Sequence, residues 1–261
     1  MADAATTRHQ HVCPKVDPVH IGGPVSTGSE NVEINGELAA RVTDRAKCFG
    51  AAGGHDLVQN GSASVEINGL PAARRGDATM HGGSVVMGSP NVEIGGASVR
   101  ATSQQLARFI ASHTNIRLEA RHPFGNIDDA ANADDVVKDV SEGRRARRSS
   151  YDDPGTGPKG SKAPGGSTAL DEDMLTGMID VSKDYQSVNV REISGAEHSG
   201  NSQHYNGLAF DVDRIDGQRV DKGAVATAFR QACRDLGASK VYGPGDKHHD
   251  HHFHCEWPPR P

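Results

Sequence analysis

The sequence predicts two folded domains, an all-β domain at the N-terminal end and a small α+β domain at the C-terminal end. Three observations lead to this expectation. A strand-and-turn pattern occurs three times before residue 97, helical spacing of apolar residues appears only after it, and a histidine-rich pair of motifs lies near the C-terminus. The length of 261 residues also suits two domains.

The composition limits the function classes that suit the chain. Hydrophobic residues make up 35% of the chain and aromatic residues 4%, so any cores are small. The formal net charge of −6 disfavours nucleic acid as a partner. There is no apolar run long enough to span a membrane, so a membrane partner is not expected.

The N-terminal residues and the cysteines indicate where the protein is made and how it is held together. The start, Met1–Ala4, lacks the basic-then-apolar pattern of a secretory signal, so we expect synthesis and initial retention in the cytoplasm. The four cysteines are too few for a disulfide scaffold, and each is interpreted as a metal ligand or a core residue. They are Cys13, Cys48, Cys233 and Cys255.

Residues 1–97 contain the repeated pattern and are expected to form hairpins. The copies are Asn31–Gly36, Ser64–Gly69 and Asn91–Gly96, and each carries Val-Glu-Ile followed by a glycine-containing turn. Alternation before such a turn predicts a strand that enters a hairpin. Repeats this short cannot each bury a core, so we expect them to pack on one another.

The second copy continues as Leu70-Pro71-Ala72-Ala73-Arg74, and histidines and cysteines are spaced along the same domain. Together these features resemble the PAAR domains, the conical caps that sharpen the trimeric spike of type VI secretion systems. The resemblance covers nearly all of residues 1–97. It implies a conical all-β fold, a structural Zn²⁺ ion and the trimeric type VI spike protein as partner.

The physics of a conical tip explains why it would need a metal. A cone apex has almost no interior, so hydrophobic stabilisation there is small and a zinc cross-link between converging loops replaces it. The resemblance implies three histidines and one cysteine as ligands, which we assign to His11, His20, Cys48 and His81. Cys13 competes with His11 for one of these places.

Residues 98–167 are predicted to form a connector made of a helix and a flexible linker. Ser103–Ser112 has helical spacing, with Leu106, Phe109 and Ile110 on one side. Beyond it the composition becomes polar, and the Gly/Pro/Ser-rich run 153–167 is typical of a tether. The arginine run 144–148 has no interleaved aromatic residues, which favours a solvated linker over a nucleic-acid patch.

Residues 168–261 are predicted to alternate helices and strands. Thr168 is the expected N-cap of a first helix, with Asp171 completing a capping box. A second helix is expected over 221–236, ended by Gly237. The inward residues of the two helices are expected to be Leu175, Met178, Ile179, Val225, Phe229, Ala232 and Cys233, and strands are expected at 188–193, 208–212, 240–243 and 252–257.

Two short motifs in this domain combine residue types that bind catalytic zinc. His204 and Asp211 are seven residues apart, and His254 follows near the C-terminus. Two nitrogens and one oxygen form a common protein ligand set that keeps one zinc position open for water. Strand alternation directs Asp211 away from the buried side of Phe210 and places His252 and His254 on one face. Taken alone, the run 247–254 is a loose metal-binding tract.

The pattern Ser202-x-His204-x-x-Gly207-x-Ala209-x-Asp211, followed by His252-x-His254, resembles the LAS metallopeptidases, the lysostaphin, D-Ala-D-Ala metallopeptidase and sonic hedgehog group. The resemblance covers residues 168–261 and matches every fixed position of the motif. It implies that His204, Asp211 and His254 bind a catalytic Zn²⁺ and that the substrate is a peptidoglycan peptide.

One position departs from several branches of that group. They place an acid three residues before the last ligand, where this chain has His251, so the pattern resembles the His-x-His branch of penicillin-insensitive murein endopeptidases. The general base therefore stays open between His252, His249 and Asp250, with His252 preferred and His249 a candidate oxyanion donor. Arg191, upstream of the motif, is a candidate for bidentate binding of a substrate carboxylate.

The two resemblances together predict a type VI effector, in which the tip caps the spike and delivers a zinc peptidase to the periplasm of target bacteria. A hydrolase confined to the cytoplasm would meet no cell wall, whereas an injected one would. An immunity protein is a further partner to expect. The alternatives are a spike cap with a non-catalytic zinc-binding adaptor domain and a metal-dependent nuclease toxin.

Overall fold

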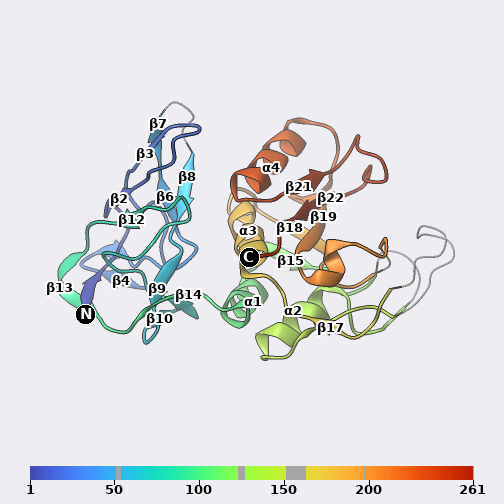
Figure 1. Ribbon diagram of the computed structural model, residues 1–261, viewed down its shortest axis with the longest axis horizontal. Helices are drawn as coiled ribbons and strands as arrows, with labels where there is room; N and C mark the ends of the chain where they lie inside the picture. Colours follow the sequence, from blue (N-terminus) through green and yellow to red (C-terminus); the bar gives the residue numbers. More distant parts are fainter. Residues whose placement is uncertain (51–53, 123–126, 151–162, 197, 261) are drawn as a thin grey trace. The chain divides into compact units, whose positions relative to one another are not determined.

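The computed structural model describes residues 1–50, 54–122, 127–150, 163–196 and 198–260. The chain divides into two compact units, Met1–Thr102 and Ser103–Pro261. Figure 1 colours the first unit from blue to green and the second from green to red. No helix in the described residues is long and apolar enough to cross a membrane.

The N-terminal unit is built from very short strands, as the repeats predict. Its strands are β1 (Ala2–Ala4), β2 (His11–Val12), β3 (His20–Ile21), β4 (Glu33–Ile34), β5 (Glu37–Leu38), β6 (Arg45–Lys47), β7 (Phe49–Gly50), β8 (His55–Leu57), β9 (Asn60–Ser62), β10 (Glu66–Ile67), β11 (Leu70–Pro71), β12 (Ser84–Val85), β13 (Ser89–Ile94) and β14 (Ser98–Arg100).

Two of the three repeats form the expected hairpins. Strands β4 and β5 pair around Asn35-Gly36, whose φ angles are 55° and 78°. Strands β10 and β11 pair around Asn68-Gly69 with φ of 51° and 79°. Positive φ at both central residues is what a type I′ hairpin turn requires, and Asn-Gly tolerates it best. The prediction was wrong for the third copy, which lies in β13 and pairs with β1.

The interior of this unit consists of small residues because three chain segments approach one another closely. Isolated bridges join Ala4 to Arg74, Thr6 to Ala39, and Arg41 to Ala72, so the segments 4–6, 39–41 and 72–74 close a ring. The three middle residues of the ring are buried together, with valines from other loops around them. This cluster is Ala5, Val25, Ala40, Ala46, Val58, Ala73 and Val85.

Within the described residues, the C-terminal unit combines four helices with a mixed sheet. Its elements are α1 (Ser103–Ser112), β15 (Ile116–Leu118), α2 (Ala133–Ser141), β16 (Ala146–Arg147), β17 (Ser167–Thr168), α3 (Glu172–Ser182), β18 (Val188–Glu192), the 3₁₀ turn η1 (Gln203–Asn206), β19 (Ala209–Ile215), β20 (Gln218–Arg219), α4 (Ala224–Asp235), β21 (Lys240–Tyr242) and β22 (Phe253–Glu256). The sheet runs β15-β18-β19-β22-β21, with β20 beside β19, and only β15 and β18 are parallel.

The predicted connector over 98–167 is corrected by this arrangement. Helix α1 forms as expected, but β15 extends the main sheet and α2 packs against α1 through buried Val136, Val137 and Val140. Asn132 caps α2 by accepting a hydrogen bond from the Asp135 amide. The acidic residues around these valines concealed the helical stripe in a segment that we interpreted as polar. Residues 153–162 of the expected tether lie outside the described residues.

The helix boundaries and faces differ from the prediction at two places. Helix α3 begins after Asp171, whose carboxylate accepts from the amides of Asp173 and Met174, so the N-cap is Asp171 and not Thr168. Helix α4 begins at Ala224, and Val225 is 50% exposed instead of facing inward. The remaining expected contacts of α3 form, since Leu175, Met178 and Ile179 are all buried.

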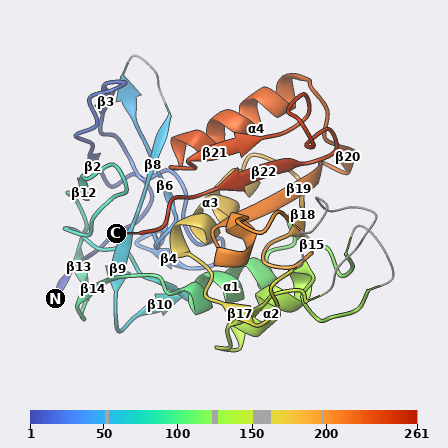
Figure 2. The same ribbon diagram turned by 45° about the vertical axis from the view of Figure 1, so that its right-hand side comes forward.

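The two faces of the main sheet carry different residues, and one of them packs against helices α3 and α4. Phe253 stacks on Phe229 of α4 with ring centroids 4.8 Å apart, and Phe210 stacks on Trp257 at 5.6 Å. Trp257 in turn lies against Gly177 of α3, where an added Cβ would come within 2.2 Å of the indole. Figure 2 shows α3 and α4 beside these strands. Alternation therefore leaves the neighbouring residues of β19 and β22 on the opposite face.

Candidate metal centres

Three donor residues meet on the face of the main sheet away from α4. Asp211 of β19 and His254 of β22 are direct partners in the antiparallel ladder. His204 comes from η1, which Ser202 caps by accepting a hydrogen bond from the His204 amide at 3.3 Å. Gly207 ends η1 with φ of 70°, and a Cβ there would lie 2.0 Å from the Ala169 carbonyl, so only glycine fits this turn.

The donor atoms are spaced as ligands of one ion are. His204 Nε2 lies 3.1 Å from Asp211 Oδ1 and 3.1 Å from His254 Nδ1, and the last two atoms are 3.0 Å apart. Ligand atoms at zinc distances of about 2.0–2.1 Å in a tetrahedral arrangement stand roughly 3.3 Å from one another. The side chains are buried, with 0%, 5% and 8% of His204, Asp211 and His254 exposed. These residues therefore fit a zinc ion.

Further contacts orient both imidazoles. Nδ1 of His204 donates to the carbonyl of Ile193 at 2.6 Å, and Nε2 of His254 lies 3.4 Å from Oε2 of Glu256, to which it donates. These partners fix the tautomers by inference from the hydrogen bonds. Each ring then directs its free lone pair at the same point, which is the usual arrangement behind metal-binding histidines.

The charges of the cluster also suit a cation. Burial opposes ionisation of Asp211, but His204, His252 and His254 outweigh it and hold the pKa of the carboxyl well below its ordinary value. Asp211 is therefore an anion in the buried site. Burial likewise disfavours the charged form of His204, and the Asp211 carboxylate reverses that effect and raises its pKa.

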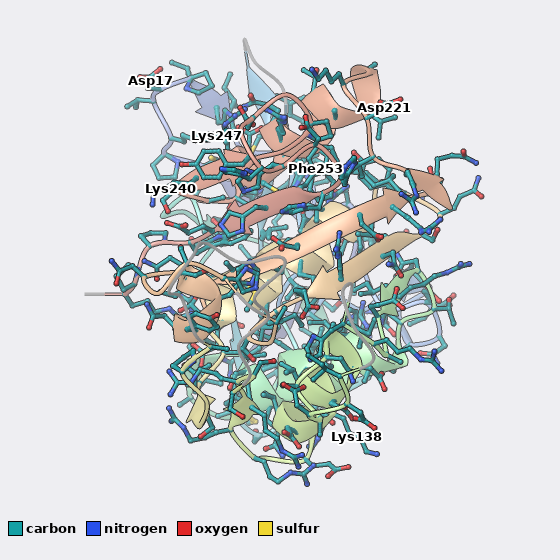
Figure 3. The ribbon with its side chains drawn as sticks, turned by 90° about the vertical axis from the view of Figure 1, so that its right-hand side faces the viewer. Asp17, Lys138, Asp221, Lys240, Lys247 and Phe253 are labelled. Carbon is teal, nitrogen blue, oxygen red and sulfur yellow. The ribbon has the colours of Figure 1, made fainter. Side chains whose placement is uncertain are left out.

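Among the predicted base candidates, His252 and His249 lie beside the donors. His252 Nε2 is 3.7 Å from Asp211 Oδ2, and burial lowers the pKa of His252, so its imidazole is neutral near pH 7. The ring of His249 is 5.0 Å from that of His252. Figure 3 marks the loop that carries them: Lys240 begins β21, Lys247 lies in the loop, and Phe253 begins β22.

The other two candidates are placed differently. Asp250 is exposed, and its Oδ1 accepts from the Gly245 amide at 3.4 Å within the same loop, so it faces the loop backbone. Arg191 is half-buried on β18, close enough for its charge to add to the lowering of the His252 pKa that burial begins. Of the predicted base candidates, His252 therefore lies beside the donors, whereas Asp250 does not.

The sequence analysis missed His198. Its ring stacks on that of His204 with centroids 3.9 Å apart and an angle of 9° between the planes. Its backbone amide donates to the Tyr205 hydroxyl at 2.7 Å, and possible ligand atoms of His198, His204 and Asp211 lie within 4.8 Å of one another. Because His198 precedes the motif, only its spacing of six residues from His204 could have indicated it.

A second buried polar cluster lies behind the site. His122 is held by Glu192 at 3.0 Å through Nδ1 and by Asp129 at 2.7 Å through Nε2. Burial disfavours the charged imidazole, but these two carboxylates outweigh it and raise the pKa of His122 to about 9. Glu192 directly precedes Ile193, whose carbonyl orients His204.

The stability of the C-terminal unit should therefore depend on pH through His122. A folded-state pKa of about 9 means that the contribution is complete below the unfolded pKa of about 6.5 and is lost as pH rises through the folded value. In His122→Gln, the melting temperature should fall less between about pH 6 and pH 9.5 than it does in the unmodified protein. Equal decreases in the two proteins, measured by circular dichroism, would contradict this.

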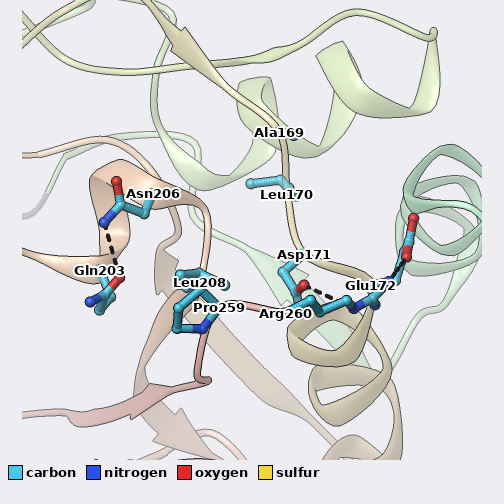
Figure 4. A pocket seen from close by; sticks show the side chains of 9 residues that line it. All are labelled: Ala169, Leu170, Asp171, Glu172, Gln203, Asn206, Leu208, Pro259 and Arg260. Atoms are coloured by element: carbon cyan, nitrogen blue, oxygen red, sulfur yellow. Dashed lines mark hydrogen bonds and ion pairs between the residues drawn. The ribbon is translucent and has the colours of Figure 1, made fainter.

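A pocket of about 490 Å³ lies on another side of η1 (Figure 4). Gln203 and Asn206 of η1 form one side of it, and their side chains hydrogen-bond at 3.0 Å. Arg260, ion-paired with Asp171 at 3.3 Å, forms the other. The lining is Ala169, Leu170, Asp171, Glu172, Gln203, Asn206, Leu208, Pro259 and Arg260, which includes none of the three donors.

In the N-terminal unit, four possible ligand residues converge from separate loops. The possible ligand atoms of Cys13, His20, Cys48 and His81 lie within 4.8 Å of one another. Cys13 Sγ is 3.4 Å from His81 Nδ1, and the rings of His20 and His81 are 5.0 Å apart. Two cysteines and two histidines are a complete donor set for structural zinc.

His11, which we assigned as a ligand, is not among these four. Its Nδ1 faces Gly23, 2.7 Å from the carbonyl oxygen, and its Nε2 lies 3.6 Å from Cys48 Sγ. The Gly23 amide also lies 3.2 Å from Nδ1 and donates to it, which leaves the ring proton on Nε2 for a hydrogen bond to a ligating sulfur. The geometry therefore adds Cys13 to the candidate ligands, while His11 belongs to a second group with Cys13 and Asp56, whose possible ligand atoms also lie within 4.8 Å of one another.

The Cys48 thiol needs a cation to ionise. Burial, followed by the neighbouring Cys13, raises the pKa of Cys48 to about 12, so this thiol is protonated at pH 7 when no metal ion is bound. A bound zinc ion would replace that proton and would couple metal binding to folding of the unit.

Comparison with family models matches residues 15–87 to the PAAR motif. The match spans the first two of the three repeats and three of the four clustered residues, His20, Cys48 and His81. The N-terminal unit is therefore a PAAR domain, a class of domain that generally binds zinc. The search of curated proteins found no match.

Proposed function

We propose that this chain, which its PAAR motif marks as a type VI spike-tip protein, carries a zinc-dependent peptidase that cleaves peptidoglycan peptides. The observation that carries the proposal is the convergence of His204 Nε2, Asp211 Oδ1 and His254 Nδ1 within 3.1 Å of one another. Catalytic zinc sites typically have three protein ligands and one position open for water, and these three residues supply such a ligand set. The neutral His252 stands beside these donors as a proton acceptor.

The roles of the chain's own residues follow from their positions. Zinc, when bound, supplies Lewis-acid polarisation of an oxygen atom. His252 accepts a proton at Nε2 from the attacking water and returns it to the leaving amine. His249, on the same loop, donates from Nδ1 to the Lys247 carbonyl at 2.7 Å, so it can donate to the developing oxyanion from Nε2 only as a doubly protonated ring. Arg191 on the neighbouring strand offers a fork of donors to a carboxylate of the peptide.

Peptidoglycan is the substrate that best explains why a spike tip and a peptidase occur in one chain. A spike tip leaves the cell that makes it, and a peptidase carried with it meets the cell wall of a neighbouring bacterium. The resemblance of the His204-to-Asp211 motif and of His252-x-His254 to LAS metallopeptidases supports the same substrate. An activity against the wall also makes an immunity protein a natural partner of the producing cell.

The test is digestion of purified sacculi by the zinc-loaded full chain. New muropeptides, separated by chromatography and identified by mass, are the expected result. His204→Ala is the negative control, and Asn206→Ala on the exposed side of η1 is the matched control that should retain activity. If the full chain holds two zinc ions and releases no muropeptide, the peptidase is excluded and a non-catalytic zinc-binding adaptor remains.

The partner should bind at the hairpin end of the N-terminal unit. Val32, Ile34, Val65 and Val92 are only partly buried against the second small core of this unit. Figure 1 draws β4 and β10 at the end of the unit away from β3 and β7. Because three equivalent segments form a ring in one chain, one copy can cover the end of a three-fold spike.

We therefore expect one chain per spike trimer, measured as the mass of the purified complex. Val65→Asp should weaken binding by about tenfold or more, because it places a charge in an apolar contact. Val16→Asp is the matched control, since Val16 is 78% exposed at the other end of the unit. Three copies per trimer, or equal weakening by both variants, would contradict the prediction.

A further inference from the structure

Two cysteines that we interpreted individually as metal ligands or core residues meet in the C-terminal unit. The Sγ atoms of Cys233 on α4 and Cys255 on β22 are 2.8 Å apart. Packed heavy atoms normally stand about 3.5–4.0 Å apart, and bonded sulfurs about 2.05 Å. Both residues are 0% exposed and carry free thiols. The two side chains thus already point at each other across the interface between helix and sheet.

The interface that the pair spans buries few residues of α4. Only Ala226, Phe229 and Cys233 are buried among the residues of α4. On the sheet, Cys255 follows His254 directly and points to the opposite face, so the pair lies behind the candidate zinc ligand. A bond between the sulfurs would therefore tie α4 to the strand that positions His254.

We propose that Cys233 and Cys255 are a disulfide-forming pair, reduced in the cytoplasm and oxidised when the protein meets an oxidising compartment. The oxidant is an external disulfide, either of a small thiol or of a thiol–disulfide oxidoreductase. One cysteine thiolate attacks it and releases one external thiol, and the second cysteine then displaces the other. Two cysteine protons and two electrons leave the chain, and the external disulfide becomes two thiols.

Burial sets the conditions under which the reaction occurs. Neither sulfur is reachable in the folded unit, so exchange proceeds while the chain folds or when α4 opens. Compartments that keep thiols reduced maintain the pair as a dithiol. The bond closes a loop between residues 233 and 255, which should raise the melting temperature of the C-terminal unit by about 6–12 °C.

The experiment uses the zinc-loaded full chain in buffers of reduced or oxidised glutathione, with brief exposure to mild urea so that α4 opens. After removal of urea, free thiols are blocked by alkylation, and peptides are mapped by mass spectrometry. We expect a peptide cross-linked between Cys233 and Cys255 only after oxidation. Melting temperatures of both samples are then measured with zinc content held equal.

Variants separate the cross-link from the effect of the side chains themselves. Cys233→Ala creates a small cavity, so its stability is compared only with itself in the two buffers, where no difference is expected. Cys255→Ala should behave in the same way. The proposal is overturned if both thiols remain alkylatable after oxidation, if either cysteine pairs with Cys13 or Cys48 instead, or if the cross-linked protein melts at the temperature of the reduced one.

This inference does not depend on the peptidase activity. Its readouts are a cross-linked peptide and a melting temperature, neither of which requires a substrate. If sacculi are not digested but the cross-link forms, the proposed function fails and the disulfide stands. If sacculi are digested but no cross-link forms, the proposed peptidase stands and the disulfide is excluded.

Discussion

His254→Ala should remove the zinc of the C-terminal unit together with all hydrolysis of sacculi, whereas His252→Ala should keep the zinc and lose activity. His254 Nδ1 shares the point at which His204 and Asp211 meet, and the two remaining donors would hold the ion weakly. His252 Nε2 is 3.7 Å from Asp211 Oδ2 and outside the triangle of donors. Loss of a general base lowers the rate by roughly 10²–10⁴-fold.

The measurement is zinc stoichiometry and sacculus digestion on the same preparations, each checked for folding by circular dichroism. Asp250→Ala is the matched control from the same loop, and it should have little effect because Asp250 is exposed. His249→Ala should retain zinc and lose less activity than His252→Ala. Zinc loss in His252→Ala with retention in His254→Ala would exchange the two roles, and full activity in His252→Ala would move the base to another residue.

Cys13→Ser and Cys48→Ser should each release the zinc of the N-terminal unit and unfold it at a lower temperature. The loops that converge there have little apolar interior, and the free energy of structural zinc binding is about 10–16 kcal/mol in small domains. In the full chain, zinc content should fall from two ions to one. Ser64→Ala, in a hairpin repeat away from the cluster, serves as the matched control for folding.

The variant His11→Gln tests whether His11 or Cys13 completes the ligand set that His20, Cys48 and His81 begin. If His11 only donates to the Cys48 sulfur, at 3.6 Å, the variant should keep its zinc with affinity about 10–100-fold lower. Competition with a chromophoric chelator gives this affinity. Full retention of zinc in Cys13→Ser, with its loss in His11→Gln, would restore the original assignment of three histidines and one cysteine.

The parts of the fold that the sequence predicted well are those fixed by local chemistry. Asn35-Gly36 and Asn68-Gly69 adopt the positive φ angles that their residue types allow, and the hairpins follow. The third copy has Gly95-Gly96 at the turn, and there the pairing with β1 prevails. A distant strand decided that outcome, which no short pattern could indicate.

In the candidate site, too, features set by local sequence were predicted, whereas those set by distant parts of the chain were not. The ten-residue motif and strand alternation predicted that Asp211 and His254 would approach each other, and the ladder pairs them directly. By contrast, the position of His198 depends on how a loop folds back and was not predicted, and the choice between Cys13 and His11 stayed open for the same reason. The contact between Cys233 and Cys255 depends on how α4 packs on the sheet. Side chains brought together by tertiary packing were thus the ones that the sequence left open.

The ring of segments 4–6, 39–41 and 72–74 also determines when the tip can fold during synthesis. Residues 4–6 leave the ribosome before their partners, Ala39, Arg74 and strand β13, are made. Such non-local pairing is slow, and residues 4–6 stay unpaired until their partners have been made. The first unit can therefore complete its pairings only after β13 and β14, its last two strands, have emerged.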